Sequence, residues 1–403
     1  MRDSLPYPIG QAAANTLEAG ERGGLRCIYL YGAMVFSAVF TFFRDKLSII
    51  PNALTNYTKN IYLGIWLSPM ALGIGYAAGP LYTGVWFAGA AFAYLLLIPI
   101  GVSTGLFSST AAAVSVKNSL GLGLMAGVGV GVLIDFLRSR IDFVRSEGAP
   151  KGLGSRLFGM FAVIVAYILT LLAGLDPISS AAVILLTCIA CAMSAAVTGQ
   201  AGINKTEIFA VMALLALRLF AHPSLAASFF IMAIVAVSCG LAGDMLNDFK
   251  AGSMLGTDPA GQLVTEAVGG LAGGFAAVFA MLAVISTYGG IGAEHGLSAG
   301  QAFAVTELMG GIDNKTLFFT ALAAGALLFL FKFPVMTLGL GLYLPFEISS
   351  VIFLGGASRF IVDKLRKAPK DEGNPGMLIA AGLMGGEGII GVILAIEHMV
   401  TGG

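Results

Sequence analysis

The chain has 403 residues, of which 57% are hydrophobic and only 11% are charged, against about 25% charged residues in a typical soluble domain. Lysine plus arginine and aspartate plus glutamate number 22 each, so no net charge is present to attract nucleic acid. This composition excludes soluble domains and nucleic-acid partners, and it predicts an all-α polytopic integral membrane protein in contact with the lipid bilayer.

Apolar segments of the length that a membrane helix needs, about 20 residues, follow one another with short connections. They predict about 11–13 transmembrane helices in a single membrane transport domain that covers residues 1–403. The candidate spans are Leu25–Phe43, Ile61–Ala78, Tyr82–Val102, Leu120–Leu137, Leu157–Leu175, Ile178–Val197, Ile208–Ala221, Ala226–Gly243, Val264–Thr287, Leu317–Phe333, Leu338–Leu354 and Met377–Ile396.

Glycine and proline interrupt several of these segments. Pro69 is followed by Gly73 and Gly75, and a similar stretch runs from Pro334 to Pro345. Small residues also allow close helix packing, which is the simpler explanation. Broken backbone within a membrane is tolerated only where protein or a watery cavity satisfies it, so the interruptions favour broken helices along a transport path.

Two parts of the chain resemble each other. A shift of 266 residues places Met70–Gly75 on Met336–Gly341, and a shift of 259 places Leu124–Gly129 on Leu383–Gly388. The shared order of the two matches predicts a duplication. The first copy would cover about residues 1–138 and the second about 244–403, with helices of residues 157–243 between them.

Two basic loops indicate the direction of the copies. Residues 138–156 and 359–370 are rich in lysine and arginine, and both loops should face the cytoplasm. The first loop follows the Leu124 helix and the second precedes the Leu383 helix, so the copies would cross the membrane in opposite senses, as an inverted repeat. Because seven spans lie between the loops, either one span is re-entrant or Leu297–Ile312 forms an eighth.

The most polar interruption follows the span that ends at Gly243. Asp244 and Asp248 are four residues apart and would share a helix face, with Lys250 available to compensate a carboxylate. A solvated loop with helix-end charges is an equally simple interpretation. Ionisable groups within a membrane are costly and mark an ion path, which is the alternative reading.

Glu387 stands among glycines early in the final apolar segment, where the first copy has Val128. The neighbouring glycines would let substrate or backbone approach its carboxylate, although a side chain that reaches the membrane surface is the simpler reading. The further candidates for a substrate or ion path are Gln200 and Asn204, which could equally form a polar turn, and Tyr343, Pro345 and Glu347 at a broken segment. The histidines lie too far apart in sequence to suggest a metal site, and no cofactor is expected.

Five stretches, in order along the chain, resemble signature segments of the oligopeptide transporter (OPT) family. They are Pro6–Gly10 (PYP-x-G), Asp248–Gly252 (D-x-K-x-G), Ala299–Ala302 (A-P-Q-A, with Gly300 in place of proline), Gly341–Pro345 (G-L-Y-L-P) and Gly385–Glu387 (A-G-E). The resemblance implies secondary transport of small peptides or metal chelates, usually driven by protons, through an all-helical bundle. Family members carry further helices ahead of the PYP-x-G segment, so we expect a chain shortened at its N-terminus.

We therefore predict a secondary active transporter in the cell (inner) membrane that uses a proton or ion gradient. No Walker A sequence is present, so hydrolysis of ATP by this chain is not expected, nor is enzyme activity. The alternative is a passive channel or a non-transporting partner subunit. In either case the chain would act as a homo-oligomer or with a companion chain that supplies the missing helices.

Overall fold

The computed structural model describes residues 25–58, 61–143, 153–201, 206–218, 221, 223–290, 314–365 and 375–401, together with residues 7, 10, 11, 13, 14 and 17. Its elements are α2 (Leu25–Thr41), the π-helix η1 (Phe42–Lys46), β1 (Ala53–Thr58), β2 (Ile61–Trp66), α3 (Pro69–Ala78), α4 (Pro80–Ala91), the π-helix η2 (Phe92–Leu97), α5 (Ile98–Ser103), α6 (Thr110–Phe143), α7 (Leu153–Leu172), α8 (Pro177–Ala201), α9 (Thr206–Leu217), α10 (Leu225–Leu255), α11 (Pro259–Tyr288), α13 (Lys315–Leu330), α14 (Val335–Tyr343), α15 (Phe346–Leu365) and α16 (Pro375–Thr401).

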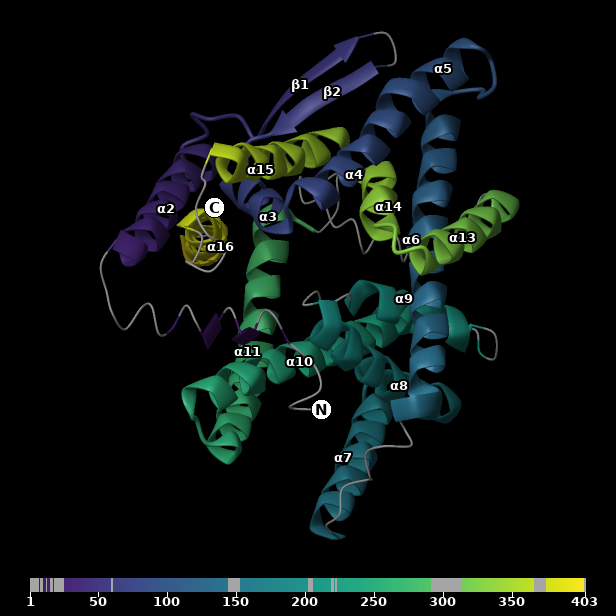
Figure 1. Ribbon diagram of the computed structural model, residues 1–403, viewed down its shortest axis with the longest axis vertical. Coiled ribbons are helices and arrows are strands. Elements are labelled where there is room, and N and C mark those ends of the chain that lie inside the picture. The colour runs from purple at the N-terminus through teal and green to yellow at the C-terminus, as the bar shows by residue number, and fades with distance from the viewer. Residues whose placement is uncertain are drawn as a thin grey trace.

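The helices form two groups. Figure 1 shows α7 to α10 gathered at one end of the molecule and α2 to α5 with α13 to α16 at the other, with the long helix α6 running between them. Seven helices of the described residues are long and apolar enough to cross a membrane, and the shorter apolar helices Gly159–Leu172 and Lys315–Leu330 accompany them. The protein is thus an all-α, multi-pass integral membrane protein, as the composition predicts.

Two predicted spans are wrong as continuous helices. The segment Ile61–Ala78 is the strand β2 followed by α3, and Leu338–Leu354 is divided between α14 and α15. Each break coincides with a proline, which cannot donate the hydrogen bond of a helix interior but suits a helix start. With 10 and 9 residues, α3 and α14 are about 15 and 13 Å long, half of a bilayer core. The predicted eighth span, Leu297–Ile312, lies outside the described residues.

The broken helices of the two predicted copies pack on each other through reciprocal contacts. A Cβ atom on Gly75 of α3 would overlap the carbonyl oxygen of Ile352 of α15, and one on Gly341 of α14 would overlap that of Trp86 of α4. The shift of 266 residues converts Gly75 to Gly341 and Trp86 to Ile352, so the two contacts are one contact with the copies exchanged. The same exchange relates the contact of Gly89 with the Leu338 carbonyl to the contact of Gly355 with the Leu72 carbonyl.

The contacts of the flanking helices are also related by exchange of the copies. Two glycines of α16 meet carbonyl groups of α2, and the glycines 259 residues earlier, on α6, meet carbonyl groups of α13. The pairs are Gly382 with Leu30, Gly386 with Met34, Gly123 with Phe318 and Gly127 with Leu322. An interface that is unchanged when its two sides are exchanged has two-fold symmetry, so a pseudo-two-fold axis relates these helices.

The connection from α2 to α3 contains the antiparallel hairpin of β1 and β2, an element that the sequence analysis did not predict. The equivalent connection in the second copy, from α13 to α14, is only Phe331–Pro334. The hairpin lies against the start of α15, where Ser350 Oγ donates a hydrogen bond to the Gly64 carbonyl. It is therefore an insertion that breaks the pseudo-symmetry.

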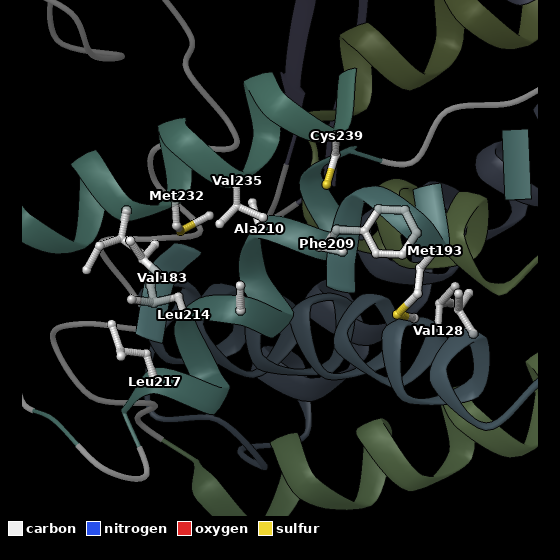
Figure 2. Close-up of a cluster of buried hydrophobic side chains, with 14 of the residues drawn as sticks. Val128, Val183, Met193, Phe209, Ala210, Leu214, Leu217, Met232, Val235 and Cys239 are labelled. Atoms are coloured by element: carbon white, nitrogen blue, oxygen red, sulfur yellow. The ribbon is translucent and has the colours of Figure 1, made fainter. Parts of the chain in front are cut away.

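The apolar core lies where α8, α9 and α10 meet α6. Figure 2 shows side chains of all four helices converging there, among them Val128, Met193, Phe209 and Cys239. Cys191 packs at the edge of this cluster, Cys188 on the same helix is exposed, and all four cysteines are free thiols.

Candidate functional site

Glu387 lies in the middle of α16 and is 5% exposed. Its carboxylate accepts hydrogen bonds from Arg44 Nη1 at 2.9 Å, from Ser68 Oγ at 3.0 Å and from the Met70 backbone N–H at 2.7 Å. The side chain is thus a buried anion with three donors, and its sequence-based alternative, a side chain that reaches the membrane surface, is wrong.

Arg44 is the cation of this site, and the sequence analysis missed it. The guanidinium is 7% exposed and also contacts both oxygens of Asp45, at 2.6 and 2.9 Å, and the Leu67 carbonyl at 2.7 Å. In sequence, an Arg-Asp pair directly after an apolar segment cannot be distinguished from an ordinary charged helix end. The partner of Arg44 can be identified only from the structure, in which α16 packs against α2.

The first turn of α3 presents one backbone N–H, that of Met70, to the same carboxylate. Ser68 is the N-cap of α3, where its hydroxyl accepts from the Ala71 N–H, and Pro69 occupies the first helical position. A helix N-terminus carries a partial positive charge and unsatisfied N–H groups. Glu387 therefore sits between two positive groups, the Arg44 guanidinium and the start of a half-length helix.

Among the described residues, the counterpart of this corner in the other copy has no buried ion pair. By the shift of 259 residues, Glu387 corresponds to Val128 of α6. The contacts of Leu30 and Met34 on α2 correspond to those of Phe318 and Leu322 on α13, a shift of 288 residues, which takes Arg44 to Lys332. Val128 is fully buried in the apolar cluster of Figure 2, and Lys332 is exposed. Because the same helix packing forms there without an ion pair, the pair at Glu387 is not required to build the architecture.

The break between α14 and α15 holds a second buried cation, Lys117 of α6, which sequence reasoning also missed. Lys117 is 2% exposed, and its Nζ donates to the Tyr343 carbonyl at 2.7 Å and lies 5.1 Å from the ring centre of Tyr94. Lys117 lies before the predicted span Leu120–Leu137, among polar residues of the kind that ordinarily flank a membrane helix. In the structure α6 begins ten residues earlier, at Thr110.

The other residues predicted at this break lie around it. Tyr343 ends α14, Pro345 lies in the break, and Glu347 is in the first turn of α15. Glu347 Oε2 is buried and has no hydrogen-bond partner among the described residues. The equivalent break between α3 and α4 is also capped by a cation, because Arg359 Nη1 donates to the Ala77 carbonyl at 2.9 Å.

Asp244, Asp248 and Lys250 lie inside α10 rather than in a loop after a span. Both aspartates are exposed and lie beside Glu266 of α11. Within the described part of the chain, Lys250 forms no ion pair with either aspartate. These carboxylates face α11 and Glu387 faces α3 and η1, so the two sets of predicted residues form separate clusters.

The N-terminal segment docks on the same part of α10. The Tyr7 N–H donates to the Gly199 carbonyl at 3.0 Å, and the Gly10 N–H donates to Asn247 Oδ1 at 3.2 Å. Gln200 lies in the last turn of α8 beside this contact, and Asn204 lies outside the described residues. A cleft of about 260 Å³ opens next to it, lined by Tyr7, Leu246, Phe249, Lys250, Ser253, Thr257, Pro259 and Gln262.

Among the described residues, no group of three or more His, Cys, Asp and Glu side chains is arranged to hold a metal ion. The three donors around Glu387 are instead groups that bind a carboxylate, namely a guanidinium, a hydroxyl and a backbone N–H.

Comparison with known proteins gives two matches. A family model described as OPT oligopeptide transporter protein matches residues 153–398. A Haemophilus influenzae protein named "Putative oligopeptide transporter" is 29% identical over an alignment of 211 residues, which covers 44% of this chain and 33% of that protein. The chain therefore matches about a third of the length of this relative.

Proposed function

Because the chain belongs to the OPT oligopeptide transporter family, we propose that it is a secondary active transporter that carries small peptides, peptide-like solutes or metal chelates across a membrane by alternating access, driven by protons. The buried Glu387–Arg44 pair carries this proposal. A titratable carboxylate inside a membrane helix is costly and typically marks an ion path. The described residues of the counterpart corner contain no such carboxylate, which supports a functional role of Glu387 rather than a structural one.

Glu387 would be the proton site. When ionised, it ties α16 to η1 through Arg44 and to α3 through Ser68 and the Met70 N–H. The charged groups that face it are Arg44 and, behind the guanidinium, Asp45; α3 contributes only uncharged donors. Protonation removes the attraction to Arg44, which keeps Asp45 as its partner, and so loosens the junction of the three elements.

The same corner could bind a proton and the substrate together. A peptide ends in a carboxylate, which can form the hydrogen bonds that Glu387 releases on protonation, both to Arg44 and to the start of α3. Protonated Glu387 and bound substrate would then occur together, and ionised Glu387 would expel the carboxylate. This is the coupling that a proton–peptide symporter needs.

Alternating access would use the pseudo-two-fold relation between the copies. We propose that the copies cross the membrane in opposite senses, so that exchange of their conformations turns an inward-open carrier into an outward-open one. Single cysteines near Arg145 and Lys367, in the two basic loops, test this with a membrane-impermeant thiol reagent. Both should react from the cytoplasmic side, and reaction from opposite sides would refute the inverted arrangement.

The direct test of coupling is Glu387→Gln in proteoliposomes, with uptake of a labelled tripeptide measured with and without an inward proton gradient. Glu397→Gln is the matched control, because Glu397 is on the same helix but its ion pair with Lys46 is exposed. We expect Glu387→Gln to abolish gradient-driven accumulation and Glu397→Gln to retain it. Unaltered coupling in Glu387→Gln would remove Glu387 as the proton site, and equilibration without accumulation by the wild type would indicate a channel.

Asp244 and Asp248 are a second proposed site on the ion path, because both lie within an apolar helix that is long enough to span a membrane. The double substitution to asparagine should lower proton-driven uptake and leave binding of the tripeptide unchanged. Full uptake by this variant would restrict the ion path to Glu387.

A further inference from the structure

The outer edge of β1 is not paired with another strand in the part of the chain that the structure describes. There β1 pairs with β2 in a two-stranded sheet, and in Figure 1 it forms the outer side of the hairpin, away from α4. Residues 54–56 of β1 are exposed. A strand edge of this kind offers a row of N–H and C=O groups to any extended chain that reaches it.

The register of the hairpin identifies which groups point outward. At its base the Leu67 N–H donates to the Asn52 carbonyl at 2.9 Å, and Leu54 lies opposite Ile65. Because hydrogen-bonded and non-hydrogen-bonded positions alternate in an antiparallel pair, the even-numbered residues of β1 bond to β2. Ala53, Thr55 and Tyr57 therefore direct their backbone N–H and C=O groups away from β2.

The hairpin is also connected to the proposed proton site. The residue that follows β2, Leu67, gives its carbonyl to Arg44 Nη1 at 2.7 Å. In the described part of the second copy, the equivalent corner has neither a hairpin nor a buried ion pair, so the two features that break the pseudo-symmetry lie next to each other. A ligand on the hairpin could therefore influence Arg44 directly.

We propose that the edge of β1 captures the transported peptide as an added antiparallel or parallel strand, through main-chain hydrogen bonds to Ala53, Thr55 and Tyr57; this rests on the proposed function of peptide transport. Recognition of the main chain suits a carrier of varied peptides, because every peptide presents the same N–H and C=O groups whatever its side chains. It also implies a preference for peptides of three or more residues, since a dipeptide has one internal amide and cannot span the outward positions.

The test uses the full-length protein in lipid nanodiscs and labelled tetra-alanine. In Thr55→Pro the outward N–H is lost while the ladder to β2 is kept, because proline is tolerated on a strand edge where its nitrogen faces away from the sheet. Thr55→Val is the matched control, since it removes the hydroxyl and keeps the N–H. We expect Thr55→Pro to bind about tenfold more weakly than Thr55→Val, the effect of one or two hydrogen bonds, and N-methylated tetra-alanine to bind weakly to both.

Hydrogen exchange of the wild type provides a measurement that does not depend on the folding of a variant. Tetra-alanine should slow exchange at Ala53, Thr55 and Tyr57, but not at Leu54, which β2 already protects. Ordinary peptide uptake without this protection would overturn the edge-strand proposal alone, whereas no binding and no uptake by the wild type would overturn the proposed function as well. Protection that rises with protein concentration in the absence of peptide would assign the edge to a second copy and also overturn the proposal.

Discussion

Removing Arg44 and removing Glu387 should have unequal effects on stability, because the two charges have different other partners. Arg44→Met leaves a buried carboxylate with only the Ser68 hydroxyl and the Met70 N–H as donors. Glu387→Gln leaves the guanidinium with both oxygens of Asp45 and with a backbone carbonyl. The uncompensated charge therefore arises mainly when the arginine is lost.

The magnitudes follow from this difference. An uncompensated buried charge costs about 3–5 kcal/mol, which we expect for Arg44→Met. A charged hydrogen bond replaced by a neutral one costs about 1–2 kcal/mol, which we expect for Glu387→Gln. The double variant should recover most of the loss of Arg44→Met, because no unpaired carboxylate remains buried: Asp45, which also loses Arg44, has a side chain that is 29% exposed. The counterpart corner around Val128 also packs without a buried ion pair among the described residues.

The wild type, the two single variants and the double variant form a double-mutant cycle. Their stabilities are compared by apparent unfolding temperatures in detergent, taken from the folded fraction after heating. The exposed pair of Lys46 and Glu397, with side chains 43% and 41% exposed, is the control, and its variants should change stability by less than about 1 kcal/mol. Equal losses for the two single variants, or a double variant that shows their sum, would refute the reasoning.

Three further predictions concern the helix framework, each measured as a change in apparent unfolding temperature. Gly341→Ala should lose about 1–3 kcal/mol of stability, because the new methyl group overlaps a carbonyl of α4. The control Gly269→Ala, with nothing within 4 Å of its Cβ position, should be neutral or slightly stabilising. Equal effects of the two variants would contradict the close contact between α14 and α4. Asp258→Ala removes the N-cap of α11 and should cost about 1 kcal/mol, and Asp258→Asn should restore most of it. Arg359→Met should cost about 1–2 kcal/mol by removing the charged donor at the end of α3, with partial recovery in Arg359→Lys; an unaffected Arg359→Met would exclude that capping role.

The pattern of apolar segments was sufficient to predict the fold class, because a membrane helix is recognised by length and composition alone. It was insufficient at the broken segments. The strand β2, with Ile61, Leu63 and Ile65, is as apolar as a helix, so hydropathy joined it to α3. Helix and strand differ there in backbone hydrogen bonding, which a sum over side chains does not measure.

The candidate site was predictable only in part. Glu387 could be found because a carboxylate in an apolar segment is conspicuous. Arg44 and Lys117 could not, because each lies at the border of a predicted span, where charges are ordinary. Their burial results from contacts with α16 and α14, more than two hundred residues away along the chain.

The glycine contacts between the copies have a mechanical consequence. At Gly382 and Gly386 the backbone of α16 touches the backbone of α2, and no side chain lies between them that could change rotamer to absorb motion. We therefore expect α2 with α16, and α6 with α13, to move as stiff pairs that each combine one helix from either copy. Spin-label distances within a pair should stay constant through the proposed transport cycle while distances between the pairs change, so that the moving parts in this proposal are not the duplicated halves.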